Sequence, residues 1–262
     1  CPVKVMQDVV DKMHMNEITI VYGQTESSPG CTQSHVDDPL DVRVNTVGRP
    51  LFGVQCKIVD PETGEDLPDE VDGEFCAKGY NIMKGYYKMP EATAAAIDEN
   101  GWLHTGDLAR RTPEGNFKIT GRIKDIIITA GGKNVSPIPL EEEIAKCPIV
   151  EHAVVVGDGR PFIGALVTLD PEGLASWLPT IGQPADLSLA DVAALPQVRE
   201  EIQPFVDRAN ATVSRAESVR KFVVLDAQFT QKNSCLTPSL KVVRPAVNRV
   251  FSDAIDQELY AG

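Results

Sequence analysis

Four short segments place polar and charged side chains beside glycine at the ends of predicted strands. They read YGQTES (22–27), GWLHTGDLA (101–109), ITGRIKDIIITAGGKNVSP (119–137) and LTPSLKVVR (236–244). Loops held by a rigid scaffold carry a large share of binding and catalytic residues. These four segments are therefore the candidate functional regions.

The first segment combines the ring of Tyr22, the small Gly23, the hydroxyl of Thr25 and the carboxylate of Glu26. A ring can stack on a base, a hydroxyl can bond a phosphate oxygen, and a carboxylate is a hard ligand for Mg²⁺. These groups suit a nucleotide. An ordinary junction between a strand and a loop is the alternative.

Each of the other three segments, taken alone, is weaker evidence for a nucleotide site. Asp107 follows Gly106 and could accept ribose hydroxyls, although a turn aspartate commonly caps its own backbone. Arg122 can offer a planar fork to a nucleotide oxygen. The AGGK run at 130–133 does not satisfy the phosphate-loop pattern G-x-x-x-x-G-K-[ST]. A lone lysine such as Lys241 is usually a solvated surface charge.

Composition indicates a globular protein: 42% of the 262 residues are hydrophobic and 24% are charged, and the length suits two domains. The net charge of −13 argues against nucleic acid as a partner. Six cysteines without a C-x-x-C pair suggest reduced thiols and a cytoplasmic protein. No apolar run reaches the length that crosses a bilayer.

The first half of the sequence predicts few helices. An amphipathic helix over 5–13 precedes a buried strand over 18–23, and residues 47–121 read as short strands separated by turns. One helix interrupts them, opened by Pro90. This pattern predicts a small β-rich subdomain, either a barrel or a bent sheet.

Beyond Gly121 the pattern changes to apolar strands and a helix over 139–147, which predicts a compact α+β unit. Residues 187–219 read mainly as helix, interrupted at Pro196 and Pro204, and a final helix is expected over 244–260. The predicted boundary lies between residues 122 and 123.

Taken together and in this order, the segments resemble the C-terminal part of the adenylate-forming superfamily: acyl-CoA synthetases, luciferases and peptide-synthetase adenylation domains. The run GYNIMKGYYKMPEATAAAIDENGWLHTGDL (79–108) is similar to bacterial fatty-acyl-CoA synthetases in particular. The resemblance implies an α/β (α+β) fold in two parts. Residues 1–122 would end a large AMP-binding domain, with a β-barrel-like subdomain at about 45–121, and residues 123–262 would form a mobile α+β lid domain.

The resemblance also implies roles on the nucleotide side. Tyr22 corresponds to the aromatic residue that stacks on adenine, Thr25 to the hydroxyl that faces the α-phosphate, and Glu26 to the Mg²⁺ ligand. Asp107 and Arg122 correspond to the pair that holds the ribose hydroxyls. The implied cofactor-binding set also includes Gly23, Gln24 and Ile119.

The remaining implied roles concern the lid domain. Lys124 falls at the hinge, and Gly131 and Gly132 match the loop that lines the pantetheine channel during thioester formation. Lys241 matches the lysine that reaches the acyl and α-phosphate oxygens during adenylation. A lysine and a glycine loop on one rotating domain can serve two half-reactions in turn.

The implied activity is that of a fatty-acyl-CoA synthetase, which uses fatty acid, ATP, Mg²⁺ and CoA and forms an acyl-adenylate. The expected location is cytoplasmic, with peripheral membrane contact left open. Alternatives within the class are an adenylation domain that charges a carrier protein, or another acyl or aryl acid ligase. The alternative outside the class is a non-catalytic fragment that binds nucleotide or CoA.

Three departures from the family pattern affect these expectations. The phosphate loop T-S-G-T-T-G-x-P-K-G is absent and is expected upstream of Cys1, so the chain is interpreted as a fragment, inactive in isolation. The segment TPSLK has Leu240 where the family usually has glycine, which removes the freedom to adopt positive φ. Residues up to about 128 resemble medium-chain enzymes and later segments a long-chain group, so acyl-chain length stays undetermined.

Overall fold

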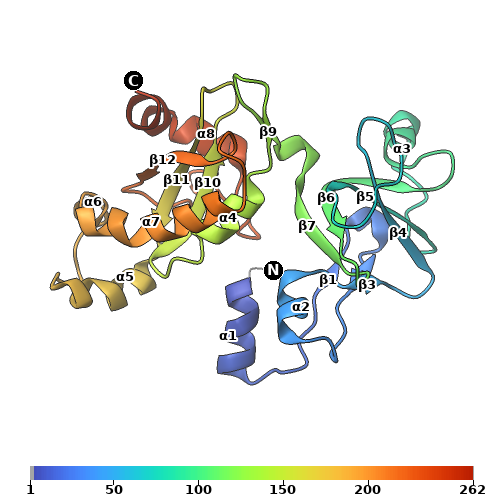
Figure 1. The fold of residues 1–262 in the computed structure, drawn as a ribbon, viewed down its shortest axis with the longest axis horizontal. Helices are drawn as coiled ribbons and strands as arrows, with labels where there is room; N and C mark the ends of the chain where they lie inside the picture. The colour runs from blue at the N-terminus through green and yellow to red at the C-terminus, as the bar shows by residue number, and fades with distance from the viewer. Residues whose placement is uncertain (1–2, 262) are drawn as a thin grey trace. The chain divides into compact units, whose positions relative to one another are not determined.

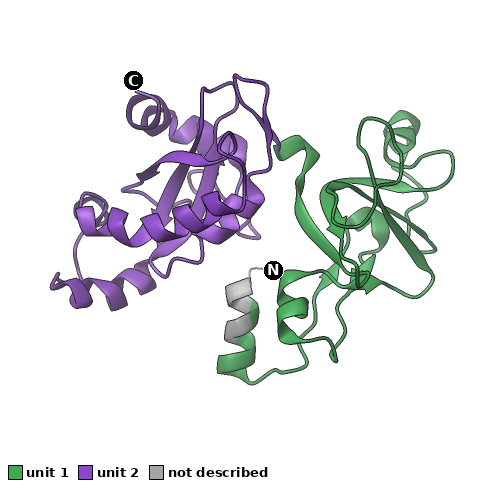
Figure 2. Cartoon of the chain, in the orientation of Figure 1, with its two compact units in different colours: residues 1–125 green, residues 126–262 purple. Residues whose placement is uncertain are grey.

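The structure, a computed structural model, describes residues 3–261. The chain forms two compact units, residues 1–125 and 126–262 (Figure 2). The division falls three residues beyond the boundary expected from the sequence.

The first unit combines short helices with two sheets. Its elements are α1 (Val3–Met13), β1 (Val21–Tyr22), η1 (Thr25–Ser27), β2 (Thr32–Gln33), α2 (Leu40–Asn45), β3 (Arg49–Pro50), β4 (Val54–Val59), β5 (Gly73–Gly79), α3 (Pro90–Ala96), β6 (Leu103–Arg111), β7 (Phe117–Arg122) and η2 (Ile123–Asp125).

The larger sheet of this unit is an antiparallel meander in the order β4-β5-β6-β7. Phe75 of β5 and Phe117 of β7 are buried in its core and meet edge to face at 5.1 Å. Strands β4 and β7 are the two edges of this sheet. Of the two forms expected for the subdomain, a barrel or a bent sheet, the structure has an open sheet, and the barrel is wrong. Four strands are too few to close around a core of this size.

The buried strand expected over 18–23 is also wrong in extent and in burial. Only Val21 and Tyr22 pair with β2, and Val21 is 53% exposed. An apolar run is buried only where a second layer covers it. Among the described residues no such layer covers Val21.

The second unit alternates strands and helices. Its elements are β8 (Ile127–Ile128), β9 (Asn134–Val135), α4 (Ile138–Ile144), β10 (Val150–Val156), β11 (Ile163–Leu169), α5 (Pro171–Trp177), η3 (Leu178–Ile181), α6 (Leu189–Ala193), α7 (Pro196–Ala211), β12 (Val219–Val224), α8 (Arg244–Val250) and η4 (Ala254–Leu259).

A central three-stranded sheet, β10-β11-β12, organises this unit. Strand β12 runs parallel to β11, so a crossover through α5, α6 and α7 must connect them. Helices α4 and α7 pack on one face of the sheet (Figure 1), where Val155 and Val167 point. Val154 and Leu166 point to the other face and meet α8 and η4. Both faces are covered, which confirms the predicted α/β class.

The helices of this unit differ from the prediction in two places. Helix α7 runs through Pro204, which lies on its exposed side, while Val198, Ile202 and Val206 hold the opposite side in the core. That packing outweighs the hydrogen bond that proline cannot make. The expected terminal helix is divided into α8 and the π-helical η4. None of the described helices is long and apolar enough to cross a membrane.

Candidate functional site

A bulge in β6 presents Asp107. Cys76 pairs with His104 and Glu74 with Leu108, so three residues of β6 lie opposite the single Phe75 of β5. Gly106 has φ +69° within this bulge, a conformation that costs glycine nothing. The bulge removes residues 105–107 from the ladder with β5, while Asp107 keeps its place opposite Arg122 of β7.

Glu74 and Thr105 hold the bulge in place. The backbone N–H of Gly106 donates to Glu74 Oε1 at 3.0 Å, and the Thr105 hydroxyl donates to the Phe75 carbonyl at 2.7 Å. A ladder interrupted by a bulge leaves backbone groups that need other partners. The buried side chain of Glu74 supplies such a partner for the N–H of Gly106.

Asp107 is 4% exposed, and both oxygens of its carboxylate have polar partners. The Tyr22 hydroxyl donates to Oδ2 at 2.7 Å, and Gln24 Nε2 donates to the same oxygen at 2.9 Å. Arg122 Nε lies 3.0 Å from Oδ1. Burial, and then the negative charge of Asp107, raise the pKa of Tyr22, so its hydroxyl stays a donor. The structure therefore joins Tyr22, Gln24, Asp107 and Arg122 into one cluster.

The segment after Tyr22 turns sharply. A Cβ added to Gly23 would overlap the carbonyl of Pro29, so the backbone approaches too closely for a side chain. Thr25 is exposed, and Glu26 Oε1 accepts from the Tyr86 hydroxyl at 2.8 Å. The second carboxylate oxygen of Glu26 is the kind of hard ligand that Mg²⁺ takes alongside phosphate oxygens. Glu26 therefore fits a magnesium ion shared with a substrate.

Two expected residues of this unit lie apart from the Asp107 cluster. Ile119 is half-buried against the core around Phe75 and Phe117. Lys124 is exposed in η2, two residues before the division between the units. The structure gives Ile119 a packing contact and Lys124 a position at the junction.

In the second unit, Gly131 and Gly132 form the exposed turn between β8 and β9. The turn is closed by Thr129, whose N–H donates to the Lys133 carbonyl and whose carbonyl accepts from Gly132 N. Gly132 has φ +75°, whereas Gly131 does not have positive φ and a Cβ there would meet only Thr129 Oγ1, at 3.9 Å. Only Gly132 is required by its backbone conformation.

Lys241 ends a second tight loop of this unit. Lys241 N donates to Thr237 Oγ1 at 3.0 Å, and Leu240 N donates to the Thr237 carbonyl at 2.9 Å. Leu240 adopts φ +60°, the conformation that glycine would favour there. The substitution of leucine for glycine therefore adds strain but leaves the loop shape accessible. The side chain of Lys241 is exposed.

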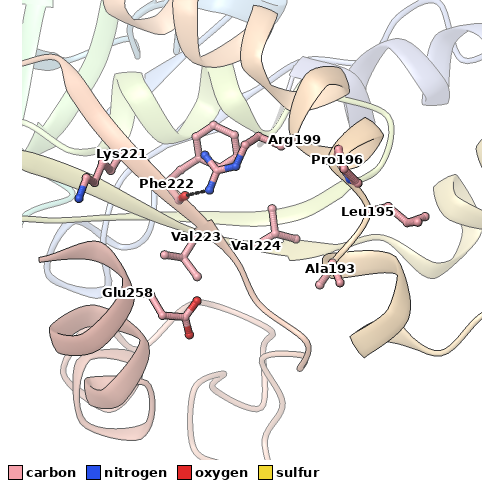
Figure 3. A pocket seen from close by; sticks show the side chains of 10 residues that line it. Ala193, Leu195, Pro196, Arg199, Lys221, Phe222, Val223, Val224 and Glu258 are labelled. Carbon is pink, nitrogen blue, oxygen red and sulfur yellow. Dashed lines mark hydrogen bonds between the residues drawn. The ribbon is translucent and has the colours of Figure 1, made fainter. Parts of the chain in front are cut away.

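A hollow of about 600 Å³ in the second unit contains none of the expected site residues. Figure 3 shows Arg199 over the ring of Phe222, with its guanidinium bonded to the Phe222 carbonyl at 2.8 Å. Arg199 is therefore held by the protein itself. The hollow adds no candidate residue.

Sequence reasoning missed two side chains that position the Asp107 cluster and Glu26. Glu74 supports the bulge before Asp107, and Tyr86 bonds Glu26. For Glu74 the available signal was a carboxylate within the apolar strand GEFCA, where an unpaired charge would be costly. For Tyr86 no local signal existed, because its contact with Glu26 spans 60 residues.

Comparison with known proteins supplies the family. Residues 124–262 match the family described as AMP-binding enzyme C-terminal domain, and residues 1–87 match the AMP-binding enzyme family. The first match covers 139 of the 262 residues. The chain belongs to the AMP-binding enzymes.

Several curated AMP-binding enzymes are similar to this chain. "Long-chain-fatty-acid--CoA ligase FadD15" of Mycobacterium bovis is 40% identical over 235 residues, 90% of this chain and 37% of the relative. "Putative acyl-CoA synthetase YngI" of Bacillus subtilis is 46% identical over 157 residues, 60% of this chain and 28% of the relative. The matched part of the chain thus spans little more than a third of the length of the first relative and less than a third of the second.

Solved AMP-binding enzymes share the fold. ATP-bound MatB from Rhodopseudomonas palustris superposes with a TM-score of 0.66 at 27% identity, covering 90% of this chain and 41% of that one. The predicted resemblance to adenylate-forming enzymes is therefore confirmed. The residue roles that it implied stay predictions.

Proposed function

We propose that this chain is the C-terminal part of an AMP-forming fatty-acyl-CoA ligase, which activates a fatty acid as its adenylate and transfers it to CoA. The observation that carries the proposal is the buried Asp107 carboxylate, held by Tyr22 and Gln24 with Arg122 beside it. The likeness to relatives named as fatty-acid CoA ligases supports the choice of substrate. Mg²⁺, CoA and a cytoplasmic location belong to this proposal.

The hydrogen bonds at Asp107 specify how a ribose would bind. Oδ2 already accepts from Tyr22 and Gln24, so both of its lone pairs are in use. Among the described residues, Arg122 Nε is the one partner of Oδ1, so this is the oxygen with remaining capacity. One ribose hydroxyl would then donate to Oδ1. The second would either displace Tyr22 or Gln24 as a donor to Oδ2 or accept from the guanidinium of Arg122.

The electrostatic demands of adenylation account for the other assigned residues. Attack of a carboxylate on the α-phosphorus brings two anions together, so positive charge must screen them. Glu26 would hold the Mg²⁺ that supplies part of this charge, with Thr25 facing the α-phosphate. Lys241 would supply an ammonium during the same step. CoA attack instead needs an open path for a thiol, which we assign to the loop of Gly131 and Gly132.

The test separates the two half-reactions in the full-length gene product. Lys241→Ala should slow fatty-acid-dependent ATP–pyrophosphate exchange by about 10²–10³, the usual effect of removing a preorganised donor. Thioester formation from supplied acyl-adenylate should stay near normal. Gly131→Leu should slow thioester formation and leave ATP–pyrophosphate exchange near normal. The variant should fold, because the backbone at Gly131 accepts a side chain without strain.

Lys232→Ala is the matched control, because Lys232 is another exposed lysine of the loop before α8. It should leave both half-reactions unchanged. Equal loss of both half-reactions in a folded Lys241→Ala protein would contradict the assignment. Exchange driven by aryl acids or amino acids but not by fatty acids would contradict the proposed substrate.

A further inference from the structure

A second cluster of chemically active side chains lies on β5 and β6. Glu74 and Cys76 are two residues apart on β5, so they share one face of the sheet, and His104 of β6 lies directly opposite Cys76. Phe75 and Ala77 point to the other face, into the core. One ligand atom from each of Glu74, Cys76 and His104 lies within 4.8 Å of the others.

The spacing matches a tetrahedral metal site. Cys76 Sγ lies 3.6 Å from His104 Nδ1, and a zinc ion with ordinary Zn–S and Zn–N bonds would separate these atoms by about 3.6 Å. Glu74 Oε2 lies 2.8 Å from His104 Nδ1. These two atoms must move apart by roughly half an ångström to reach the distance between two ligand atoms of a tetrahedral zinc ion.

Neighbouring groups lie beside two of the three ligands, Glu74 and His104. The second oxygen of Glu74 accepts from Gly106 N, and Asp98 Oδ2 lies 4.0 Å from His104 Nε2. A carboxylate behind a metal-binding histidine is the usual way its free ring nitrogen is held. Asp98 is itself fixed, because its Oδ1 accepts from the N–H groups of Asn100 and Trp102.

We propose that Glu74, Cys76 and His104 form a binding site for Zn²⁺ or a similar borderline-soft divalent ion. A thiolate and a carboxylate neutralise the two charges of the ion, so the buried site carries no net charge. Binding releases the Cys76 thiol proton to solvent, and the imidazole proton moves from Nδ1, where Glu74 accepts it without metal, to Nε2, facing Asp98. The fourth position is left for water. The ion enters where the side chain of His104 is 32% exposed.

This site differs from the proposed magnesium site at Glu26 in its ligands. Mg²⁺ prefers an octahedron of oxygen ligands, whereas sulfur and imidazole favour zinc and related metals.

The test uses the purified 262-residue chain, stripped of metal and kept reduced, with Co²⁺ as the spectroscopic probe. We expect one Co²⁺ per chain, with a thiolate-to-cobalt charge-transfer band and intense tetrahedral visible bands. Zn²⁺ should abolish both signals, and excess Mg²⁺ should leave them unchanged. Cys76→Ser should remove the charge-transfer band.

Two further variants keep the test decisive. His104→Asn changes a partly exposed side chain, so it should fold, and it should weaken Co²⁺ binding at least tenfold. Cys56→Ser is the matched control, because Cys56 lies on β4 of the same sheet, opposite Ala77, and should keep full binding. Absence of tetrahedral cobalt bands, or bands that survive both Cys76→Ser and His104→Asn, would overturn the proposal.

Discussion

Two tyrosines of the first unit each donate a hydroxyl to a carboxylate, in opposite surroundings. Tyr22 bonds Asp107 at 2.7 Å and Tyr86 bonds Glu26 at 2.8 Å. Asp107 is 4% exposed, whereas Tyr86 is 37% exposed. Phenylalanine at either position removes the hydroxyl and keeps the ring, so Tyr22→Phe and Tyr86→Phe form a matched pair.

The burial difference sets the expected magnitudes. A hydrogen bond to a charged group contributes about 1.5–3 kcal/mol when the group cannot turn to water, so Tyr22→Phe should lower the free energy of unfolding by about 2 kcal/mol. Water can replace the hydroxyl of Tyr86, so Tyr86→Phe should cost about 0.5 kcal/mol or less.

Tryptophan fluorescence can isolate the unit concerned. The chain has two tryptophans, Trp102 in the first unit and Trp177 in the second, so a Trp177→Phe background reports on the first unit alone. In urea, a loss of about 2 kcal/mol moves the midpoint down by roughly 1 M. Equal shifts for Tyr22→Phe and Tyr86→Phe would refute the reasoning. So would a Tyr22→Phe midpoint unchanged from that of the parent.

Three further predictions concern single residues. Leu240 is 64% exposed with φ +60°, so Leu240→Gly should stabilise the second unit by about 0.5–1 kcal/mol in urea unfolding followed by Trp177; a loss of stability would show that its side chain packs. His152 is the single histidine of residues 126–262, and burial lowers its pKa. Histidine in the unfolded chain takes up a proton near pH 6.5, so the free energy of unfolding of this unit should fall as the pH drops from about 7 to 5.5. His152→Gln should make that fall smaller. Burial raises the pKa of the neighbouring Glu151, which therefore stabilises the folded unit as the pH falls further. Gly23→Ala should destabilise the first unit by at least about 2 kcal/mol, since its Cβ overlaps the Pro29 carbonyl, and a thermal midpoint equal to that of the parent would contradict this.

Local sequence patterns predicted much of the second unit. Strands such as Ile163–Leu169 are continuous apolar runs, and both faces of their sheet proved to be covered. The resemblance implied that Asp107 and Arg122 hold the ribose hydroxyls, and this role stays a prediction. The register of β6 with β7 places these two residues opposite each other. Apolar strands depend on short-range patterns, which a single sequence displays.

Other features depend on distant contacts and could not be read from the sequence. Gln24 bonds Asp107 across 83 residues, and Glu74 reaches Gly106 across 32. Local preference predicts that a helix ends at Pro204, yet α7 continues past this residue because its buried side packs in the core. Leu240 adopts positive φ because the loop closed by Thr237 requires that conformation. In each case tertiary contacts outweigh a local preference.

Nucleotide discrimination by the Asp107 carboxylate tests the central claim most directly. In the full-length gene product, calorimetry should show AMP binding at least roughly tenfold tighter than 2′,3′-dideoxy-AMP, because hydrogen bonds to a charged group are worth about 1.5–3 kcal/mol. Asp107→Asn, with its fold verified by tryptophan fluorescence, should bind the two nucleotides within about twofold of each other. Full discrimination retained by Asp107→Asn would show that this carboxylate does not hold the ribose.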